Sequence, residues 1–212
     1  VCVHQLEAPL LFQHTLYGHL GRRNKSCLLQ MGKKGRSPYK KLMKYLKSQG
    51  RNYMPDDAIN IMSVPLDFEE LSKFWGYSLS DEILNELEID LSFDLQNLVL
   101  YEDTRQTIAR LTTAGFKIAV CSNLAKPYGD QVLSMLPSLD AYIWSYEAGA
   151  IKPNPKIYEV VLEKVGCEAH EVLFVGDTLL ADVSGPRSQG MSARLIDRKN
   201  GQNLHDLLAD LF

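Results

Sequence analysis

The sequence predicts an α/β protein, with a Rossmann-like parallel sheet flanked by helices and a small all-helical region. Two observations predict the sheet. Short apolar runs alternate with helical patterns from residue 101 onward, which is typical of βαβ units. One of these runs, residues 172–175, is apolar at every position, as in a strand that is buried on both faces. A third observation, leucines three and four residues apart over residues 81–98, predicts a long helix in the separate helical region.

Two helices are predicted ahead of the sheet. Residues 39–48 place apolar side chains among lysines at helical spacing, and residues 81–98 carry the leucine stripe. No strand signal of comparable clarity separates them. The chain therefore divides into an atypical basic N-terminal segment (1–36), a helical region (37–98) and an α/β core (99–212). The leucines of the stripe are Leu84, Leu87, Leu91, Leu95 and Leu98.

The core alternates helices and strands in a regular order. Gly115 and Gly166 follow two of the helical patterns directly, and a glycine at that position is a common helix stop. The expected helices cover residues 102–113, 127–136, 155–165 and 182–188, with a terminal helix from residue 203. The expected strands cover residues 117–121, 141–144, 172–175 and 193–196.

The bulk composition is that of an ordinary globular chain. Of 212 residues, 45% are hydrophobic and 23% are charged, and no apolar run approaches the length of a membrane span. No secretory signal is predicted. The cysteines lack paired spacing, so neither a zinc site nor a disulfide framework is indicated, and a reducing, cytoplasmic setting is expected. They are Cys2, Cys27, Cys121 and Cys167.

The net charge of −3 hides a strong asymmetry along the chain. Residues 1–55 contain one acid and eleven lysines or arginines, whereas the remainder carries 25 acids and 12 bases. Such a split can mark a patch for nucleic acid or another acidic partner. It can equally be a solvated helix face, and this interpretation is favoured because no aromatic platform or nucleic-acid motif accompanies the bases.

Polar side chains follow three of the predicted strands. Ser122 and Asn123 come after the strand at 117–121, Lys152 follows the strand at 141–144, and Asp177 and Asp182 follow the strand at 172–175. Ligands of open α/β sheets bind at the edge where the carboxyl ends of the strands meet. A hydroxyl, a cation and two carboxylates at that edge suit a phosphate group bound with Mg²⁺.

Each of these residues also has a purely structural interpretation. Ser122 and Asn123 favour turns and can simply end a strand. Asp177 can cap the helix that follows it. Lys152 alone would more often be a solvated surface lysine, and Asp182 can pair with Lys152 rather than contact a metal.

The order of these motifs resembles the haloacid dehalogenase-like superfamily of phosphohydrolases. The residues that carry the resemblance are FKIAVCSNLA (116–125), DAYIWSYEAGAIKPNPKIYEVV (140–161) and VLFVGDTLLADVSGPRSQGM (172–191). The resemblance implies that Ser122 and Asn123 bind phosphate, that Lys152 stabilises its charge, and that Asp177 and Asp182 hold Mg²⁺. It also implies that residues 37–98 form a cap over the active site.

The nucleophile that the resemblance implies is missing from this chain. Members of the superfamily carry an apolar strand followed by Asp-x-Asp-Gly-Thr near the N-terminus, whose first aspartate attacks phosphorus. This chain has no aspartate before Asp56. If SCLLQMGKKG (26–35) occupies the motif, the two aspartates fall on Arg23 and Lys25. If APLLFQHTLY (8–17) supplies the strand, the nucleophile position falls on Gln13.

Two other residues are alternative candidates for the nucleophile. Asp94, in FDLQNL (93–98), lies within the leucine stripe, and the positions expected as Asp, Gly and Thr hold other residues. Cys27 lacks the arginine-closed phosphate loop of a cysteine phosphatase. Neither is favoured, and without a third carboxylate Mg²⁺ is expected to bind weakly.

The sequence therefore supports two hypotheses of different classes. The first is Mg²⁺-dependent hydrolysis of a small phosphate monoester through an aspartyl-phosphate, as the resemblance implies. The second is a catalytically inactive relative that acts as a binding or regulatory protein, with its basic N-terminal region contacting a polyanion. The path of residues 1–31 discriminates between them, because the enzyme needs this segment as the central strand with a carboxylate near Asp177.

Overall fold

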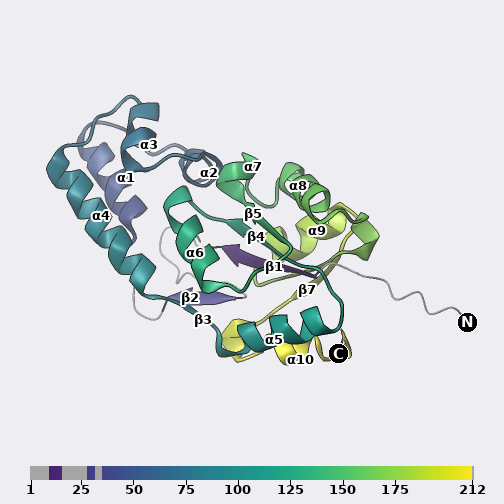
Figure 1. Ribbon diagram of the computed structural model, residues 1–212. Coiled ribbons are helices and arrows are strands. Elements are labelled where there is room, and N and C mark those ends of the chain that lie inside the picture. Colours follow the sequence, from purple (N-terminus) through teal and green to yellow (C-terminus); the bar gives the residue numbers. More distant parts are fainter. Residues whose placement is uncertain (1–9, 16–27, 32–34, 212) are drawn as a thin grey trace, which may run out of the picture.

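The computed structural model describes residues 10–15, 28–31 and 35–211. Its centre is a five-stranded parallel sheet with the strand order β5-β4-β1-β6-β7 (Figure 1). The parallel sheet and its flanking helices confirm the predicted fold class. The strands are β1 (Leu10–Thr15), β4 (Ile118–Asn123), β5 (Ala141–Trp144), β6 (Leu173–Gly176) and β7 (Ser192–Leu195).

Side chains of the central strands alternate between two apolar cores. In β4, Ile118 and Val120 pack into one buried cluster and Ala119 and Cys121 into the other. Adjacent side chains of a strand point to opposite faces, so each face of the sheet has its own core. The first core includes residues of α5 (Glu102–Thr113) and α10 (Leu204–Leu207), and the second includes residues of α8 (Pro155–Val165).

The ends of the core helices follow from local sequence signals. In α8, the Asn154 side chain accepts a hydrogen bond from the Lys156 N–H, and Pro155 occupies the first turn. Gly166 ends the helix in the left-handed conformation, with a φ of 66°. Both predicted boundaries of this helix, and both of α5, are therefore confirmed.

Helices α1–α4 lie together on one side of the sheet (Figure 1). They are held by a buried cluster in which the rings of Tyr39 and Phe68 lie 4.8 Å apart and Leu87 is fully buried. Helix α2 lies beside α7, which follows β5, so this helical group contacts the core. The bounds are α1 (Pro38–Ser48), α2 (Asp57–Ser63), α3 (Phe68–Phe74), α4 (Asp81–Gln96) and α7 (Ser145–Ala148).

The structure adds elements that the sequence did not predict. Strands β2 (Leu29–Met31) and β3 (Leu98–Leu100) form an antiparallel ribbon, so Leu98 belongs to a strand and not to the preceding helix. The helix expected at 127–136 is a 3-10 turn followed by α6 (Gly129–Met135). The helix expected at 182–188 is a π-helical turn, Leu179–Ser184, followed by α9 (Gly185–Ser188).

The ladder partners of the N-terminal strands decide between the two placements of the missing motif. Strand β1 lies in the centre of the sheet, between β4 and β6, and pairs Gln13 with Cys121. Among the described residues, 29–31 pair with β3 and lie outside the five-stranded sheet. The strand therefore comes from the segment 8–17, and the placement on 26–35 is wrong. Arg23, Lys25 and Cys27 lie outside the described residues.

The basic stretch of α1 faces acidic residues in the structure. Lys41 lies 2.6 Å from Asp90 and 3.3 Å from Glu86, both on α4. For Lys41, these contacts agree with the interpretation of the basic stretch as a solvated helix face. Among the helices that the structure describes, none is both long and apolar enough to cross a bilayer.

Candidate active site

The residues that follow the strands meet at one edge of the sheet. Strands β4 and β6 both lie parallel to β1, so Asn123 and Gly176 end at the same carboxyl edge. Lys152 reaches this edge from the segment that follows β5 and α7, and its side chain is buried. The structure links Asn123 to Lys152 and Lys152 to Asp182 through direct contacts, and Ser122 and Asp177 lie at the same edge beside Asn123 and Gly176.

Asn123 and Lys152 are locked together by two reciprocal hydrogen bonds. The Lys152 N–H donates to Asn123 Oδ1 at 2.8 Å, and Asn123 Nδ2 donates to the Lys152 carbonyl at 3.0 Å. The side chain of Asn123 is therefore occupied in fixing the lysine segment.

The Lys152 ammonium group lies among oxygen atoms. Its Nζ donates to the Cys121 carbonyl at 2.8 Å and lies 3.6 Å from Asp182 Oδ1. The side chains of Lys152 and Asp182 are both fully buried. A buried ammonium needs such partners because desolvation penalises its charged form. Lys152 is therefore not the solvated surface lysine of the structural interpretation.

Asp182 is held close to the strand that precedes it. Its Oδ2 accepts a hydrogen bond from the Thr178 N–H at 2.7 Å, and its side chain lies against Gly176, where an added Cβ would collide with it. Burial raises the pKa of Asp182 to about 6, against the lowering effect of Lys152. Its Oδ1 has no hydrogen-bond partner among the described residues.

Asp177 is the more accessible of the two carboxylates, being half-buried. Burial raises its pKa, and the positive charge of Lys152 opposes this shift. The Thr178 hydroxyl donates to Asp177 Oδ1 at 3.3 Å. Thr178 contacts both aspartates in this way, and its position directly after Gly-Asp is the signal by which the sequence could have identified it.

Ser122 is fully buried at the end of β4. In the ladder it pairs with His14 of β1 on one side and with Trp144 of β5 on the other. Cys121, which precedes it, is also fully buried, and burial raises the pKa of its thiol to about 11. This thiol is therefore protonated at neutral pH and is not a nucleophile.

Few protein side chains at this edge are available as ligands for Mg²⁺. Within the described ranges, no three His, Cys, Asp or Glu side chains converge in a way that could hold a metal ion. Mg²⁺ is nevertheless commonly bound by one or two carboxylates together with waters and substrate phosphate oxygens. Asp177 offers one such carboxylate. Asp182 offers Oδ1, which accepts no hydrogen bond from the described residues although Lys152 Nζ lies 3.6 Å from it.

Asp94 has a structural role outside the candidate active site. It is buried near the end of α4, and its carboxylate accepts hydrogen bonds from the N–H groups of Arg36 at 2.6 Å and Ser37 at 3.1 Å. Both oxygens are thus engaged at the entry to α1. This geometry agrees with the prediction that Asp94 is not the nucleophile.

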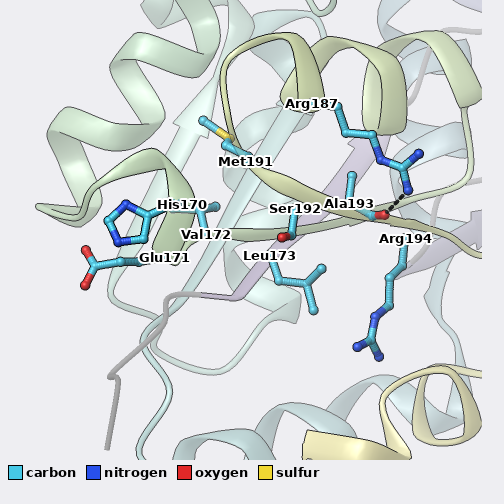
Figure 2. Close-up of a pocket in the computed structure, with 9 residues that line it drawn as sticks. All are labelled: His170, Glu171, Val172, Leu173, Arg187, Met191, Ser192, Ala193 and Arg194. Atoms are coloured by element: carbon cyan, nitrogen blue, oxygen red, sulfur yellow. Dashed lines mark hydrogen bonds between the residues drawn. The ribbon is translucent and has the colours of Figure 1, made fainter. Parts of the chain in front are cut away.

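An open groove of about 540 Å³ lies at the other end of β6 and β7 (Figure 2). Its lining comes from the residues around Leu173 and Ser192, which begin these strands, whereas Asp177 follows the end of β6. Arg187 in this groove donates to the Ala193 carbonyl at 2.8 Å, as Figure 2 shows. The groove is therefore separate from the candidate active site.

The chain is similar to known hydrolases over most of its length. The family model of the haloacid dehalogenase-like hydrolases matches residues 37–190. A Mycobacterium tuberculosis protein named as a phosphatase is 32% identical over 187 residues, covering 74% of this chain and 84% of that relative. A Danio rerio haloacid dehalogenase-like hydrolase domain-containing protein is 31% identical over 113 residues, covering 52% of this chain and only 46% of that relative's length.

Solved structures share the fold. A haloacid dehalogenase-family enzyme of Bacteroides thetaiotaomicron, solved with magnesium and inorganic phosphate, superposes with a TM-score of 0.60 at 17% identity. The superposition covers 94% of this chain and 98% of that one. Together with the family match over residues 37–190, this places the chain in the haloacid dehalogenase-like hydrolase family.

Proposed function

We propose that this chain binds the phosphate group of a small phosphate monoester at the carboxyl edge of its sheet and hydrolyses the ester with the help of Mg²⁺. The observation that carries the proposal is the meeting of Lys152, Asp177 and Ser122 at one sheet edge, with Lys152 buried and held in place. The names of the relatives support a phosphatase activity. The reaction cleaves the ester with water and yields an alcohol and inorganic phosphate.

Each residue would contribute through its position. The Ser122 hydroxyl and the backbone N–H groups beside it would donate to phosphate oxygens. Lys152 uses one of its three N–H bonds on the Cys121 carbonyl, which leaves donors for the phosphate. Because the site is buried, that charge is weakly screened, and replacement of Lys152 by methionine is expected to lower the rate about 10²–10³-fold.

Asp177 would be the principal residue holding Mg²⁺, with Asp182 supporting it from within the protein. When bound, the ion would neutralise phosphate charge. Asp182 would act chiefly by fixing Lys152 and the Thr178 segment. We further propose that residues 37–98 serve as a cap for this site, since α2 lies beside α7 and α7 begins the segment that leads to Lys152.

A second function is favoured by one specific observation. Strand β1 occupies the central position of the sheet, and its sequence LLFQHT contains no carboxylate. If β1 is the strand of the family motif, the position of the nucleophilic aspartate falls on Gln13. A neutral amide is a very poor nucleophile. On this alternative, the chain binds a phosphate ester without turning it over.

The experiment that separates the two functions measures hydrolysis of an aryl phosphate with Mg²⁺ and, in the same samples, binding of inorganic phosphate. It compares the native chain, Asp177→Asn, Gln13→Asp and a chelator control, with Asp81→Asn as a matched control because Asp81 is exposed on α4. Turnover by the native chain that Asp177→Asn and the chelator abolish supports the hydrolase.

Two other results decide against the hydrolase. Turnover that appears only in Gln13→Asp supports the binding function, because the phosphate site is then intact and lacked only its nucleophile. Absence of both turnover and phosphate binding from all folded samples overturns both functions.

A further inference from the structure

The segment that follows the candidate phosphate-binding residues contacts the helical group α1–α4. Lys126 Nζ lies 3.5 Å from Glu70 at the start of α3, and the Tyr128 side chain forms a hydrogen bond with Asp94 of α4. Residues 124–128 begin one position after Asn123. A displacement of the helical group would therefore shift residues that lie directly next to the phosphate-binding edge.

One buried hydroxyl makes the most central of these contacts. Ser145, the first residue of α7, is fully buried, and its Oγ lies 2.5 Å from the Met62 carbonyl of α2. The same Oγ accepts a hydrogen bond from the Leu124 N–H at 3.0 Å. Ser145 thus joins the helical group to the residue directly after Ser122 and Asn123.

The proton of this hydroxyl has two acceptors within reach. The Leu124 carbonyl lies 3.2 Å from Ser145 Oγ, and the Met62 carbonyl lies closer. A serine hydroxyl carries a single proton and can rotate, so it donates to one acceptor at a time. With α2 in place, the shorter distance selects Met62.

If α2 moved away, the Met62 carbonyl and the Ser145 hydroxyl would both still find hydrogen-bond partners. Met62 lies in the last turn of α2, where carbonyl groups have no intrahelical partner and can bond to water once exposed. The Ser145 proton can then turn to the Leu124 carbonyl while the Leu124 N–H bond is kept. Buried polar groups are costly only when they lose all partners, so this arrangement lowers the cost of undocking.

We propose that Ser145 is a positioning residue that couples the docking of α2 to the phosphate-binding end of β4, by switching its proton between the Met62 and Leu124 carbonyls. The proposal rests on the proposed function for its meaning in a reaction, since it names β4 as part of a phosphate site. The contact itself can be tested without any activity.

The first test measures amide hydrogen exchange at residue resolution in the native chain and in Ser145→Ala. We expect exchange at Leu124 and in α2 to become about tenfold faster in the variant, because the hydroxyl that fixes both is gone. Exchange in α8 should not change. Ser72→Ala is the matched control, because Ser72 is a fully buried serine of α3 whose hydroxyl has no hydrogen-bond partner among the described residues.

Two results of this test would overturn the proposal. Unchanged exchange at Leu124 would mean that the hydroxyl does not hold the segment. An equal acceleration in α8 would mean that Ser145→Ala merely lowers global stability.

The second test adds inorganic phosphate with Mg²⁺ and measures both binding heat and exchange. In the native chain, phosphate should slow exchange in α2, whereas in Ser145→Ala phosphate should bind without that effect. Equal slowing in both proteins contradicts the coupling. If the native chain binds no phosphate, the proposed function fails, and the first test alone then decides whether Ser145 joins the two parts.

Discussion

Arg51, which lies between α1 and α2, forms an ion pair with Asp57, the first residue of α2. This pair should contribute strongly to the stability of the helical group. Arg51 makes two bonds to the Asp57 carboxylate, one of them 2.8 Å long, and its guanidinium lies 4.2 Å from the centre of the Trp75 ring. The Asp57 carboxylate also accepts the Met54 N–H at 2.8 Å. The Asp57 side chain is 1% exposed and that of Arg51 is 10% exposed.

Replacement of Asp57 by asparagine keeps the shape of the side chain but leaves the arginine charge without its partner. Breaking a buried ion pair in this way costs about 3–5 kcal/mol of unfolding free energy. We expect the lower end, about 3 kcal/mol, because the guanidinium keeps some contact with water and with the Trp75 ring. For a chain of this size, that change corresponds to a fall of about 6–12 °C in the unfolding midpoint.

Chemical and thermal unfolding of the native chain and Asp57→Asn measure this difference. Asp210→Asn is the matched control, because Arg194 also makes two bonds to Asp210, of 2.6 and 2.7 Å, but this pair lies at the surface. Surface pairs contribute little, so this control should be close to the native chain. A loss below about 1 kcal/mol in Asp57→Asn, or equal losses in both variants, would refute the reasoning from burial.

The pH dependence of the unfolding free energy tests independently whether the charged Asp57 carboxylate stabilises the fold. Burial alone would raise the pKa of Asp57, but the hydrogen bonds from Arg51 and Met54 outweigh it and hold the pKa below its usual value. A carboxyl whose pKa is lower in the folded state stabilises the fold above its unfolded pKa, and this contribution disappears as pH falls through the folded pKa. The difference between the native chain and Asp57→Asn should therefore be full at pH 7 and shrink below about pH 4.

Three further variants or reactions test other parts of the structure. Gly185→Ala should lower stability by about 1–3 kcal/mol in thermal unfolding, since the new Cβ would collide with the Tyr158 hydroxyl, whereas an unchanged midpoint would show that Tyr158 moves aside easily. Alkylation followed by mass spectrometry should modify Cys167, which is partly exposed, at least about tenfold faster than Cys121, whose thiol is buried with a raised pKa; equal rates would contradict that burial. Asp94→Asn should retain whatever phosphatase activity the native chain has, because the carboxylate is engaged at the entry to α1, and complete loss of activity would reopen its candidacy as nucleophile.

The parallel sheet could be predicted because its strands and helices carry their own local signals. The apolar run at 172–175 and the boundaries at Asn154 and Gly166 need no information from elsewhere in the chain. Strands β2 and β3 were missed because each has only three residues, too few to show periodicity, and because they pair across about seventy positions. Helix α3 did carry a signal, since Asp67 and Glu70 form a capping box that is visible in the sequence.

The candidate site could be predicted in its residues but not in its bonds. The polar positions follow strands, and parallel topology brings strand ends to one edge. That Lys152 donates to a backbone carbonyl, and that the Asn123 side chain is used for fixing Lys152, depends on distances that no sequence spacing contains. The central place of β1 was likewise open, because its apolar run resembles several others and no aspartate marks its end.

The charges gathered at the sheet edge bear on how the site would be filled. Lys152 and Asp182 lie close enough to compensate each other, which leaves the charge of Asp177 as the local excess. A phosphate dianion alone would meet that excess negative charge, and a lone Mg²⁺ would find few carboxylates. The two ions together would satisfy each other and the site, so each should raise the affinity of the chain for the other. This coupling requires no nucleophile. The residues that would bind phosphate and Mg²⁺ can therefore persist in a chain whose central strand lacks an aspartate.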